Sequence, residues 1–265
     1  MRYTKKELRE KFGFSRDTLR LYEERGLIQP EIDPANGYRY YDDWQVNLLW
    51  DCRYYQGMGF TLAEVQEILQ RDSLEELEER VARRERAAAE ELRYQGLVQR
   101  EHERFGAALR GVRGLMGRCE LEDFEGCLFV YEREGHEPAR ELAPEAVAFA
   151  NRHAALMKPY FWFPELEEGR YFWGSAMRLP LFEELGEEAG PAGVARLEPC
   201  RALVTCIDAG ERWNFGRGLF DGLVDEAVRQ GLVPAGGLHG MLVARTHEAD
   251  GYHRYVRALL PVAGQ

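Results

Sequence analysis

The chain has 265 residues, with 46 Asp and Glu side chains against 35 Lys and Arg, and a formal net charge of −11 at pH 7. Two compact domains are the natural expectation for this length. The sequence has no apolar run of membrane-spanning length, no secretion-signal core, and five cysteines without a disulfide framework. These features argue against a membrane or secreted protein and predict a cytoplasmic one.

The first forty residues predict a helix-turn-helix. Thr4 can cap a helix that ends at Gly13, and Ser15 can cap a second helix whose first turn carries Asp17. The second helix would present its basic outer side to base edges and phosphates, as a recognition helix does. Predicted DNA contacts on this helix are Ser15, Arg16, Thr18, Arg20 and Tyr22.

A hairpin follows the second helix. Asn36-Gly37 is a strong hairpin signal, and the strand-forming residues behind it place a basic side chain among tyrosines. Tyrosine hydroxyls and arginine both donate hydrogen bonds to phosphate oxygens. The hairpin is therefore predicted to be a wing that contacts DNA through Tyr38, Arg39 and Tyr40. Further helices are expected from Asp42 to about Gln56 and from Thr61 to about Leu69.

Residues 3–70 resemble the DNA-binding domain of the MerR family of transcriptional regulators across its whole length. The resemblance is carried by Glu7-Leu8, Gly13-Phe14-Ser15, Thr18-Leu19-Arg20, Tyr22-Glu23, Gly26-Leu27-Ile28, Asn36-Gly37-Tyr38-Arg39-Tyr40 and Gly59-Phe60-Thr61-Leu62. Arg9 departs from the family, which usually has a small residue at this helix crossing. The resemblance implies a homodimer that binds a near-palindromic, double-stranded promoter element and distorts it, acting indirectly on RNA polymerase.

The acidic charge lies away from these candidate contacts. Residues 1–41 carry nine basic and seven acidic side chains, whereas residues 119–265 carry 14 basic and 24 acidic ones. DNA binding is therefore expected to depend on the local placement of Arg16, Arg20 and Arg39.

Residues 74–116 contain no proline and are rich in Glu, Arg, Ala and Leu. In one heptad frame eight of the twelve core positions are apolar, including Val98 and Phe105, which predicts a coiled-coil helix. By the family resemblance this helix would pair antiparallel with that of a second protomer. A lone helix packed on its own domain is the alternative.

The rest of the chain alternates strand-like and helix-like segments, which suggests two similar α+β halves. In length, element order and its closing Leu259-Leu260-Pro261-Val262, it resembles the GyrI-like effector domain of multidrug-sensing MerR regulators. The expected fold class is α+β. A winged helix-turn-helix (1–72), a coiled-coil dimerisation helix (73–117) and a two-fold repeated α+β ligand-binding domain (118–265) would follow one another.

Seven aromatic rings fall within residues 160–173, more than a small α+β core needs. Rings that line a concave site would bind flat, apolar ligands by stacking. In GyrI-like domains an acidic residue commonly lies where this chain has Arg257, so a cationic ligand is disfavoured unless Glu134, Asp208 or Glu226 substitutes. Candidate ligand-binding residues are Tyr160, Trp162, Tyr171, Trp173, Tyr255 and Arg257, and the alternative for each ring is a core position.

Two other functions deserve comparison. Cys119 and Cys127 resemble the metal-binding loop of copper-type MerR regulators, although such proteins end soon after it, and both cysteines lie in strand-like segments. A hydrolase is the second alternative, since some GyrI-like domains are hydrolases, but no nucleophile elbow, metal-ligand histidine pattern or phosphate-binding loop appears. The sequence thus favours a non-enzymatic regulator without cofactor or metal, which senses an aromatic small molecule.

Overall fold

The computed structural model describes residues 2–138, 142–187, 190–211 and 214–263. Its contacts divide the chain into two compact units, Met1–Leu92 and Arg93–Gln265. No helix within the described ranges is both long and apolar enough to cross a membrane.

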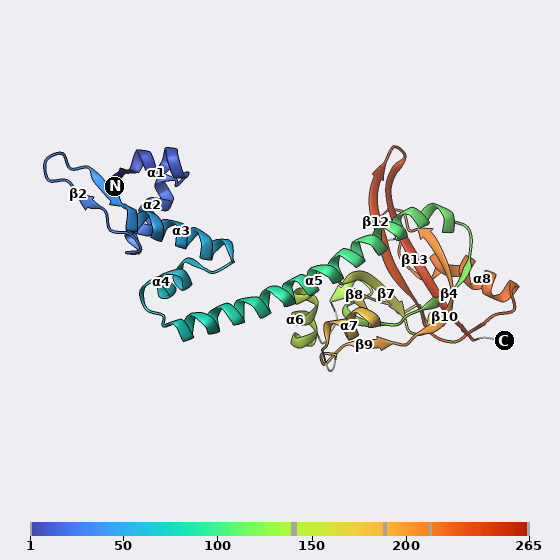
Figure 1. Ribbon diagram of the computed structural model, residues 1–265. Coiled ribbons are helices and arrows are strands. Elements are labelled where there is room, and N and C mark those ends of the chain that lie inside the picture. Colours follow the sequence, from blue (N-terminus) through green and yellow to red (C-terminus); the bar gives the residue numbers. More distant parts are fainter. Residues whose placement is uncertain (1, 139–141, 188–189, 212–213, 264–265) are drawn as a thin grey trace. The chain divides into compact units, whose positions relative to one another are not determined.

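The first unit is a small helical domain with a three-stranded antiparallel sheet of order β1-β3-β2 (Figure 1). Its elements are β1 (Arg2–Thr4), α1 (Lys5–Phe12), α2 (Arg16–Glu24), β2 (Glu31–Ile32), β3 (Arg39–Asp42), α3 (Asp43–Gly57) and α4 (Leu62–Gln70). This order confirms the predicted winged helix-turn-helix.

Local chemistry determines where these helices begin and end. Thr4 caps α1 in a capping box with Glu7, and Gly13 ends the helix with φ 71°. Ser15 caps α2 by accepting a hydrogen bond from the Thr18 backbone amide at 3.0 Å. These contacts satisfy backbone groups that a helix end otherwise leaves without partners. Leu8, Leu19 and eleven other buried side chains then form the core between the helices.

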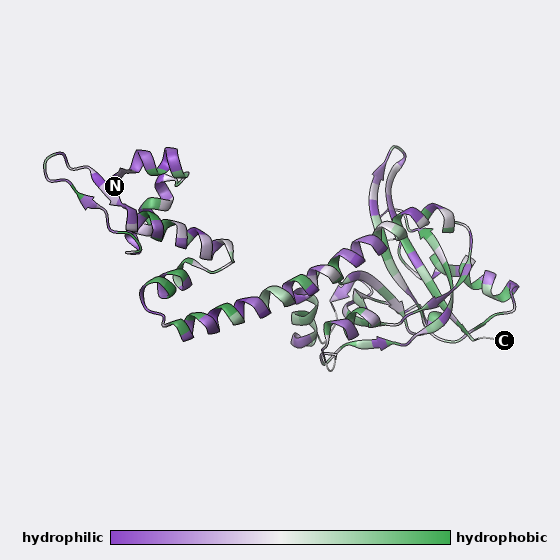
Figure 2. Ribbon diagram, viewed as in Figure 1, coloured by the Kyte–Doolittle hydropathy of each residue, from purple (hydrophilic) through white to green (hydrophobic). Residues whose placement is uncertain are grey.

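Helix α5 (Leu74–Leu115) begins at a capping box formed by Ser73 and Glu76. Hydrophobic and hydrophilic residues alternate along its first half (Figure 2), and Leu74 and Leu92 are both more than 70% exposed. From Arg93 onward the helix belongs to the second unit, where Leu97 and Val112 are buried. The boundary between the two compact units therefore lies within α5, after Leu92. The boundary expected from the sequence, at residue 117, comes after the end of this helix.

The second unit is built on one large antiparallel sheet of order β4-β10-β13-β12-β7-β8-β5-β6, with β9 pairing β5 and β11 pairing β13 (Figure 1). Its strands are β4 (Glu120–Phe124), β5 (Cys127–Glu134), β6 (Glu137–Pro138), β7 (Lys158–Phe163), β8 (Phe172–Arg178), β9 (Ala195–Leu197), β10 (Cys200–Asp208), β11 (Val233–Pro234), β12 (Leu238–Glu248) and β13 (Gly251–Ala263). Its other helices are α6 (Pro144–Arg152), α7 (Leu179–Leu185) and α8 (Asp221–Arg229), with the short 3-10 helices Leu166–Glu168 and Arg217–Phe220.

This sheet has two halves with the same connectivity. The first runs β5, α6, β7, β8 and the second runs β10, α8, β12, β13. In each half the third strand pairs with the first and the second, and the halves join where β7 pairs with β12. The predicted α+β class with a two-fold repeat is confirmed. The strand that precedes each half in the chain pairs with the other half. β4 precedes β5 but pairs with β10, and β9 precedes β10 but pairs with β5.

The two faces of the sheet have different coverings. On one face α6 and α8 pack on the sheet through apolar side chains that include Phe149 of α6 and Leu223 of α8. The opposite face carries a smaller cluster around Phe129 and Tyr160, and a second around Val204 and Leu259. A cavity of the second unit lies on this opposite face.

Candidate functional site

The second helix, α2, presents exposed basic side chains beside the wing. Arg16 is exposed, and the Arg20 side chain is 68% exposed, with only long contacts to Asp17 (3.8 Å) and Glu24 (3.7 Å). On the wing Tyr38 is 64% exposed. These positions agree with the predicted DNA contacts, which stay a prediction because no DNA is present.

Glu23 joins the wing to the helix-turn-helix. Its carboxylate accepts from the Arg39 guanidinium at 2.5 Å and from the hydroxyl of the buried Tyr41, and lies 2.8 Å from the ammonium group of Lys5. The hydrogen bond from Tyr41 and its burial raise the pKa of that phenol. A DNA phosphate that contacts Arg39 would therefore share this side chain with the ion pair to Glu23. Glu23 was not among the predicted site residues.

Three of the predicted DNA contacts are engaged by other parts of the protein or are partly buried. Tyr22 is only 3% exposed, and its hydroxyl donates to the Gln56 side chain, so it is a core residue and the predicted DNA contact is corrected. Ser15 caps α2, and its hydroxyl also lies 2.8 Å from that of Thr18. Tyr40 is half-buried in β3.

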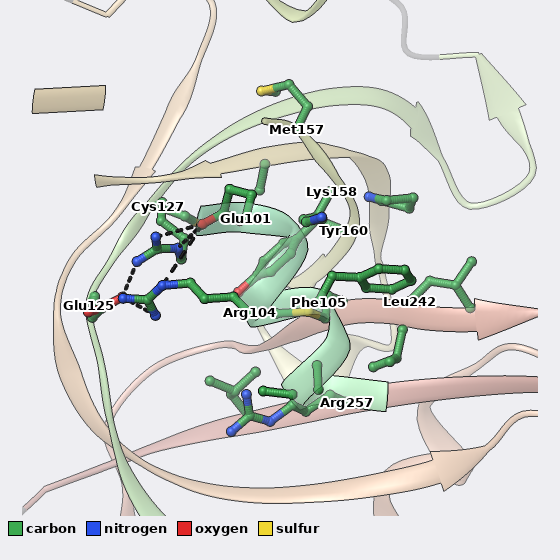
Figure 3. A pocket seen from close by; sticks show the side chains of 18 of the residues that line it. Glu101, Arg104, Phe105, Glu125, Cys127, Met157, Lys158, Tyr160, Leu242 and Arg257 are labelled. Carbon is green, nitrogen blue, oxygen red and sulfur yellow. Dashed lines mark hydrogen bonds and ion pairs between the residues drawn. The ribbon is translucent and has the colours of Figure 1, made fainter. Parts of the chain in front are cut away.

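A cavity of the second unit has a volume of about 960 Å³ (Figure 3). Its walls are the C-terminal half of α5, the end of β4, residues 154–157, and parts of β7, β8, β12 and β13. Phe105 of α5, Phe124 of β4 and Tyr160 of β7 supply aromatic rings, and the rest of the lining combines aliphatic side chains with charged ones. Ligand sites are typically cavities of this size with apolar walls and a few polar groups.

Charged side chains lie at two places in the cavity wall. Glu101, only 4% exposed, accepts from Arg178 at 2.7 Å, and Arg178 also contacts Glu125 at 2.5 Å. On β13, Arg257 is ion-paired with Glu122 of β4. Figure 3 shows the Glu101 and Glu125 group on one side of the Tyr160 ring. An arginine thus neutralises each of these carboxylates.

Tyr160, which lines the cavity, belongs to a buried polar pair. The Tyr160 hydroxyl lies 2.7 Å from His239 Nδ1, and the His239 ring packs 4.6 Å from the Phe124 ring centroid. Burial lowers the pKa of His239 to about 4, and it raises the pKa of Tyr160. Both groups are therefore neutral at pH 7.

The predicted aromatic set does not converge on one site. Cross-strand partners share a face of an antiparallel sheet, and the register pairs Trp162 with Phe172 and Phe161 with Trp173. Tyr160 and Trp162 consequently point to the cavity face, whereas Tyr171 and Trp173 join the core on the opposite face. Of these four candidate rings only Tyr160 lines the cavity, and Tyr171 and Trp173 occupy core positions, the alternative given for each ring.

The remaining candidate ligand-binding residues also divide into those that line the cavity and those that do not. Trp162 packs on Phe129 and Phe172 beside the cavity without lining it. Tyr255 donates to Glu248 and stacks on His253, also outside the cavity. Only Tyr160 and Arg257 of the six predicted ligand residues line it.

The metal hypothesis finds no support in the geometry. Cys119 packs against the α8 side of the sheet, whereas Cys127 is buried on the cavity side. Burial raises the pKa of both thiols, that of Cys127 to about 12, which disfavours the metal-binding thiolate. Among the described residues no group of three His, Cys, Asp or Glu side chains could hold a metal ion.

Sequence reasoning missed Glu101, Phe105 as a cavity residue, Glu122 and His239. A signal for the first existed, because Leu97, Glu101, Ala108 and Val112 recur at helical spacing on one face of α5. The heptad frame concealed this face. No local pattern points to His239, because its environment comes from a distant strand.

Several solved structures resemble the chain weakly. The EcmrR–DNA complex in an open promoter complex covers 99% of this chain and all of that chain at a TM-score of 0.36 and 13% identity. SAV2435 bound to tetraphenylphosphonium covers 56% of this chain and 94% of that chain, at a TM-score of 0.33 and 12% identity. A hydrolase from Listeria innocua covers 60% of this chain and 98% of that chain, at a TM-score of 0.38 and 14% identity. Likeness at this level carries no argument about ligand or reaction.

Sequence comparison is more specific for the first unit. HTH-type transcriptional regulator SkgA of Caulobacter vibrioides is 33% identical over 96 residues, which is 36% of this chain and 38% of that protein. The mercuric resistance operon regulatory protein of Bacillus cereus is 36% identical over 69 residues, 26% of this chain and 52% of that protein. The family model of the MerR HTH family regulatory protein matches residues 3–72. This segment, with its two capped helices and its wing, is therefore similar to the DNA-binding domain of MerR HTH family regulators.

Proposed function

We propose that the chain is a dimeric transcriptional regulator that binds promoter DNA through residues 3–72 and responds to an apolar, ring-containing small molecule. The observation that carries this proposal is the cavity of about 960 Å³, which has α5 as one wall. The same helix is continuous back to Leu74, two residues after the MerR segment ends. Ligand sensing and DNA binding would therefore both involve α5 or the chain that leads directly into it.

The coupling would act through the contacts of α5 inside the second unit. Glu101 and Phe105 both lie on the cavity wall, and Glu101 holds α5 to Arg178 of β8. A ligand can shift an equilibrium between two conformations only if it binds them with different affinities. A ring inserted against Phe105 would change the packing of α5 on the sheet, which supplies that difference.

The partners follow from the same proposal. A second copy of the chain would pair along the exposed first half of α5, as the family resemblance implies. The dimer would act on RNA polymerase indirectly, by distorting the promoter in the cytoplasm. Multidrug binding, as in the GyrI-like effector domains that the second unit resembles in its sequence pattern, belongs to this proposal. So does the absence of catalysis, and incubation with activated esters should leave them intact.

A thermal-shift screen of aromatic compounds, with and without metal ions, tests the sensor. We expect some aromatic compounds to raise the melting temperature of the wild-type protein in a concentration-dependent way. The control variant is Phe105→Ala, which should respond less because it removes a ring from the cavity wall. Stabilisation by a soft metal ion alone, with no aromatic responder, would contradict the proposal.

A further inference from the structure

The charges around the cavity define its ligand more narrowly than its apolar walls do. Four carboxylates line it, and each is within 4 Å of an arginine. These pairs are Glu101 with Arg178, Glu122 with Arg257, Asp123 with Arg201, and Glu125 with Arg178 and Arg104. An arginine therefore balances the charge of every carboxylate in the lining.

Two cationic side chains of the lining lack some of the ion-pair or hydrogen-bond partners that the carboxylates have. Lys158 has no carboxylate partner within the described part of the chain, and its ammonium group lies 4.9 Å from the ring centroid of Phe105. The Nε atom of Arg257 is buried and lacks a hydrogen-bond partner among the described residues, although another nitrogen of the same guanidinium contacts Glu122. Both side chains line the cavity, one on β7 and the other on β13.

The energetic consequence differs for the two signs of charge. A cation would approach carboxylates whose charge an arginine already balances, and it would meet the repulsion of that arginine. An anion would break no existing pair, and it would supply an acceptor for a buried N–H group that has none. The lining also contains five cationic side chains, Arg104, Lys158, Arg178, Arg245 and Arg257, against its four carboxylates.

We propose that the ligand of this cavity is an aromatic compound that carries a carboxylate or a comparable single anionic group. Its ring packs against Tyr160 and Phe105, its anion contacts Arg257, and Lys158 adds positive charge to the same lining. This inference rests on the proposed sensor function and specifies the chemical class of the effector.

Three probes with one ring system test the charge. Calorimetry on the full-length protein compares 2-naphthylacetate, the neutral 2-naphthylacetamide and the cationic 2-(2-naphthyl)ethylammonium. We expect the acid to bind about tenfold more tightly than the amide, since a hydrogen bond to a charged group is worth about 1.5–3 kcal/mol. The ammonium compound should bind most weakly.

Two variants test the assigned residues. Arg257→Met and Lys158→Met should each reduce the preference for the acid over the amide, while the affinity for the amide changes little. Because Arg257→Met leaves Glu122 without its partner, the double variant Glu122→Gln, Arg257→Met should show the same loss of preference. The matched control is Arg196→Met, since Arg196 is exposed, ion-paired with Glu198 and outside the cavity.

The possible outcomes separate the two proposals. If none of the three probes binds, the aromatic sensor itself is overturned. If the amide or the ammonium compound binds as well as the acid, the sensor function stands and the anionic class is overturned. A preference for the acid that survives in both Arg257→Met and Lys158→Met would overturn the assignment to these two side chains.

Discussion

Tyr160 and His239 meet across the strand pair that joins the two halves of the sheet, with the phenol oxygen 2.7 Å from the imidazole Nδ1. Tyr160 comes from the second strand of the first half, and His239 from the second strand of the other. The pair therefore links the two halves of the sheet beside the cavity, which Tyr160 lines and His239 does not.

The burial of His239 predicts a pH dependence of stability. Its pKa falls from an ordinary value of 6.5 to about 4 in the folded protein, so the unfolded chain takes up this proton more readily. The contribution of His239 is fully present above pH 6.5 and is lost as the pH falls toward 4. It amounts to about 3 kcal/mol at about 1.4 kcal/mol per pH unit. Urea unfolding between pH 4 and 7 measures it.

The control for this prediction is His247, an exposed histidine on the same strand. His239→Asn should flatten the stability profile between pH 4 and 6.5, and His247→Asn should leave its shape unchanged. Equal slopes for wild type and His239→Asn would show that other groups account for the dependence.

The ion pair between Glu101 and Arg178 should stabilise the second unit by holding α5 on the sheet. Glu101→Gln leaves Arg178, whose side chain is only 22% exposed, with the Glu125 carboxylate alone. We expect a loss of about 2–3 kcal/mol in the free energy of unfolding, because breaking a buried pair by removing one partner is costly. The matched change at the exposed Glu103 should have little effect, and chemical denaturation compares the two. A similar loss in both variants would contradict a special role for Glu101.

Arg20→Ala and Arg39→Ala should weaken promoter binding without unfolding the first unit. Arg20 is exposed on α2, and Arg39 has a side chain that is 47% exposed on the wing. If Arg39 contacts only phosphate, its loss should weaken all sequences alike and reduce the salt slope by about one. Fluorescence anisotropy at several salt concentrations checks this, with the exposed Arg71→Ala as the control. Unchanged affinity in both variants would contradict the assignment.

Trp173→Ala and Phe105→Ala should separate core from cavity. Trp173 packs 4.6 Å from Phe215 and 5.5 Å from Phe161 in the core, so its removal should lower stability by about 3–5 kcal/mol. Phe105 is 38% exposed and lines the cavity, so its removal should cost about 1–3 kcal/mol of ligand affinity with less effect on folding. Melting temperature and ligand affinity are measured together. The reverse pattern would move the site to the other face.

Dimerisation should depend on the first half of α5. Val98 packs against the core of its own unit and Phe105 lines the cavity, so substitutions there would disturb folding or ligand binding as well. Leu92 is 74% exposed and Val81 is 38% exposed, and both lie in the half of α5 that precedes the second unit. Leu92→Glu with Val81→Glu should give monomers in light scattering, because charges in an apolar seam are costly. A persistent dimer would contradict a seam at these positions.

Much of the first unit could be predicted from the sequence because its signals are local. The caps at Thr4 and Ser15 and the turn at Gly13 act within three or four residues, which a linear sequence displays directly. The sequence wrongly suggests that Tyr22 contacts DNA, because its hydrogen-bond partner, Gln56, lies 34 residues away in the chain. The same distance effect concealed the role of Glu23, whose partner Arg39 comes from the wing.

For the second unit the sequence by itself determined the α+β class, the repeated element order and the presence of an aromatic cluster, because strand and helix periodicity are local properties. It could not decide which rings face the cavity, since a strand has two faces and only its pairing with other strands assigns them. The register of β7 with β8 places Trp173 opposite Phe161, away from Tyr160. The tertiary structure alone also placed Arg257 beside Glu122, across 135 residues of chain, and thereby decided the charge of the cavity.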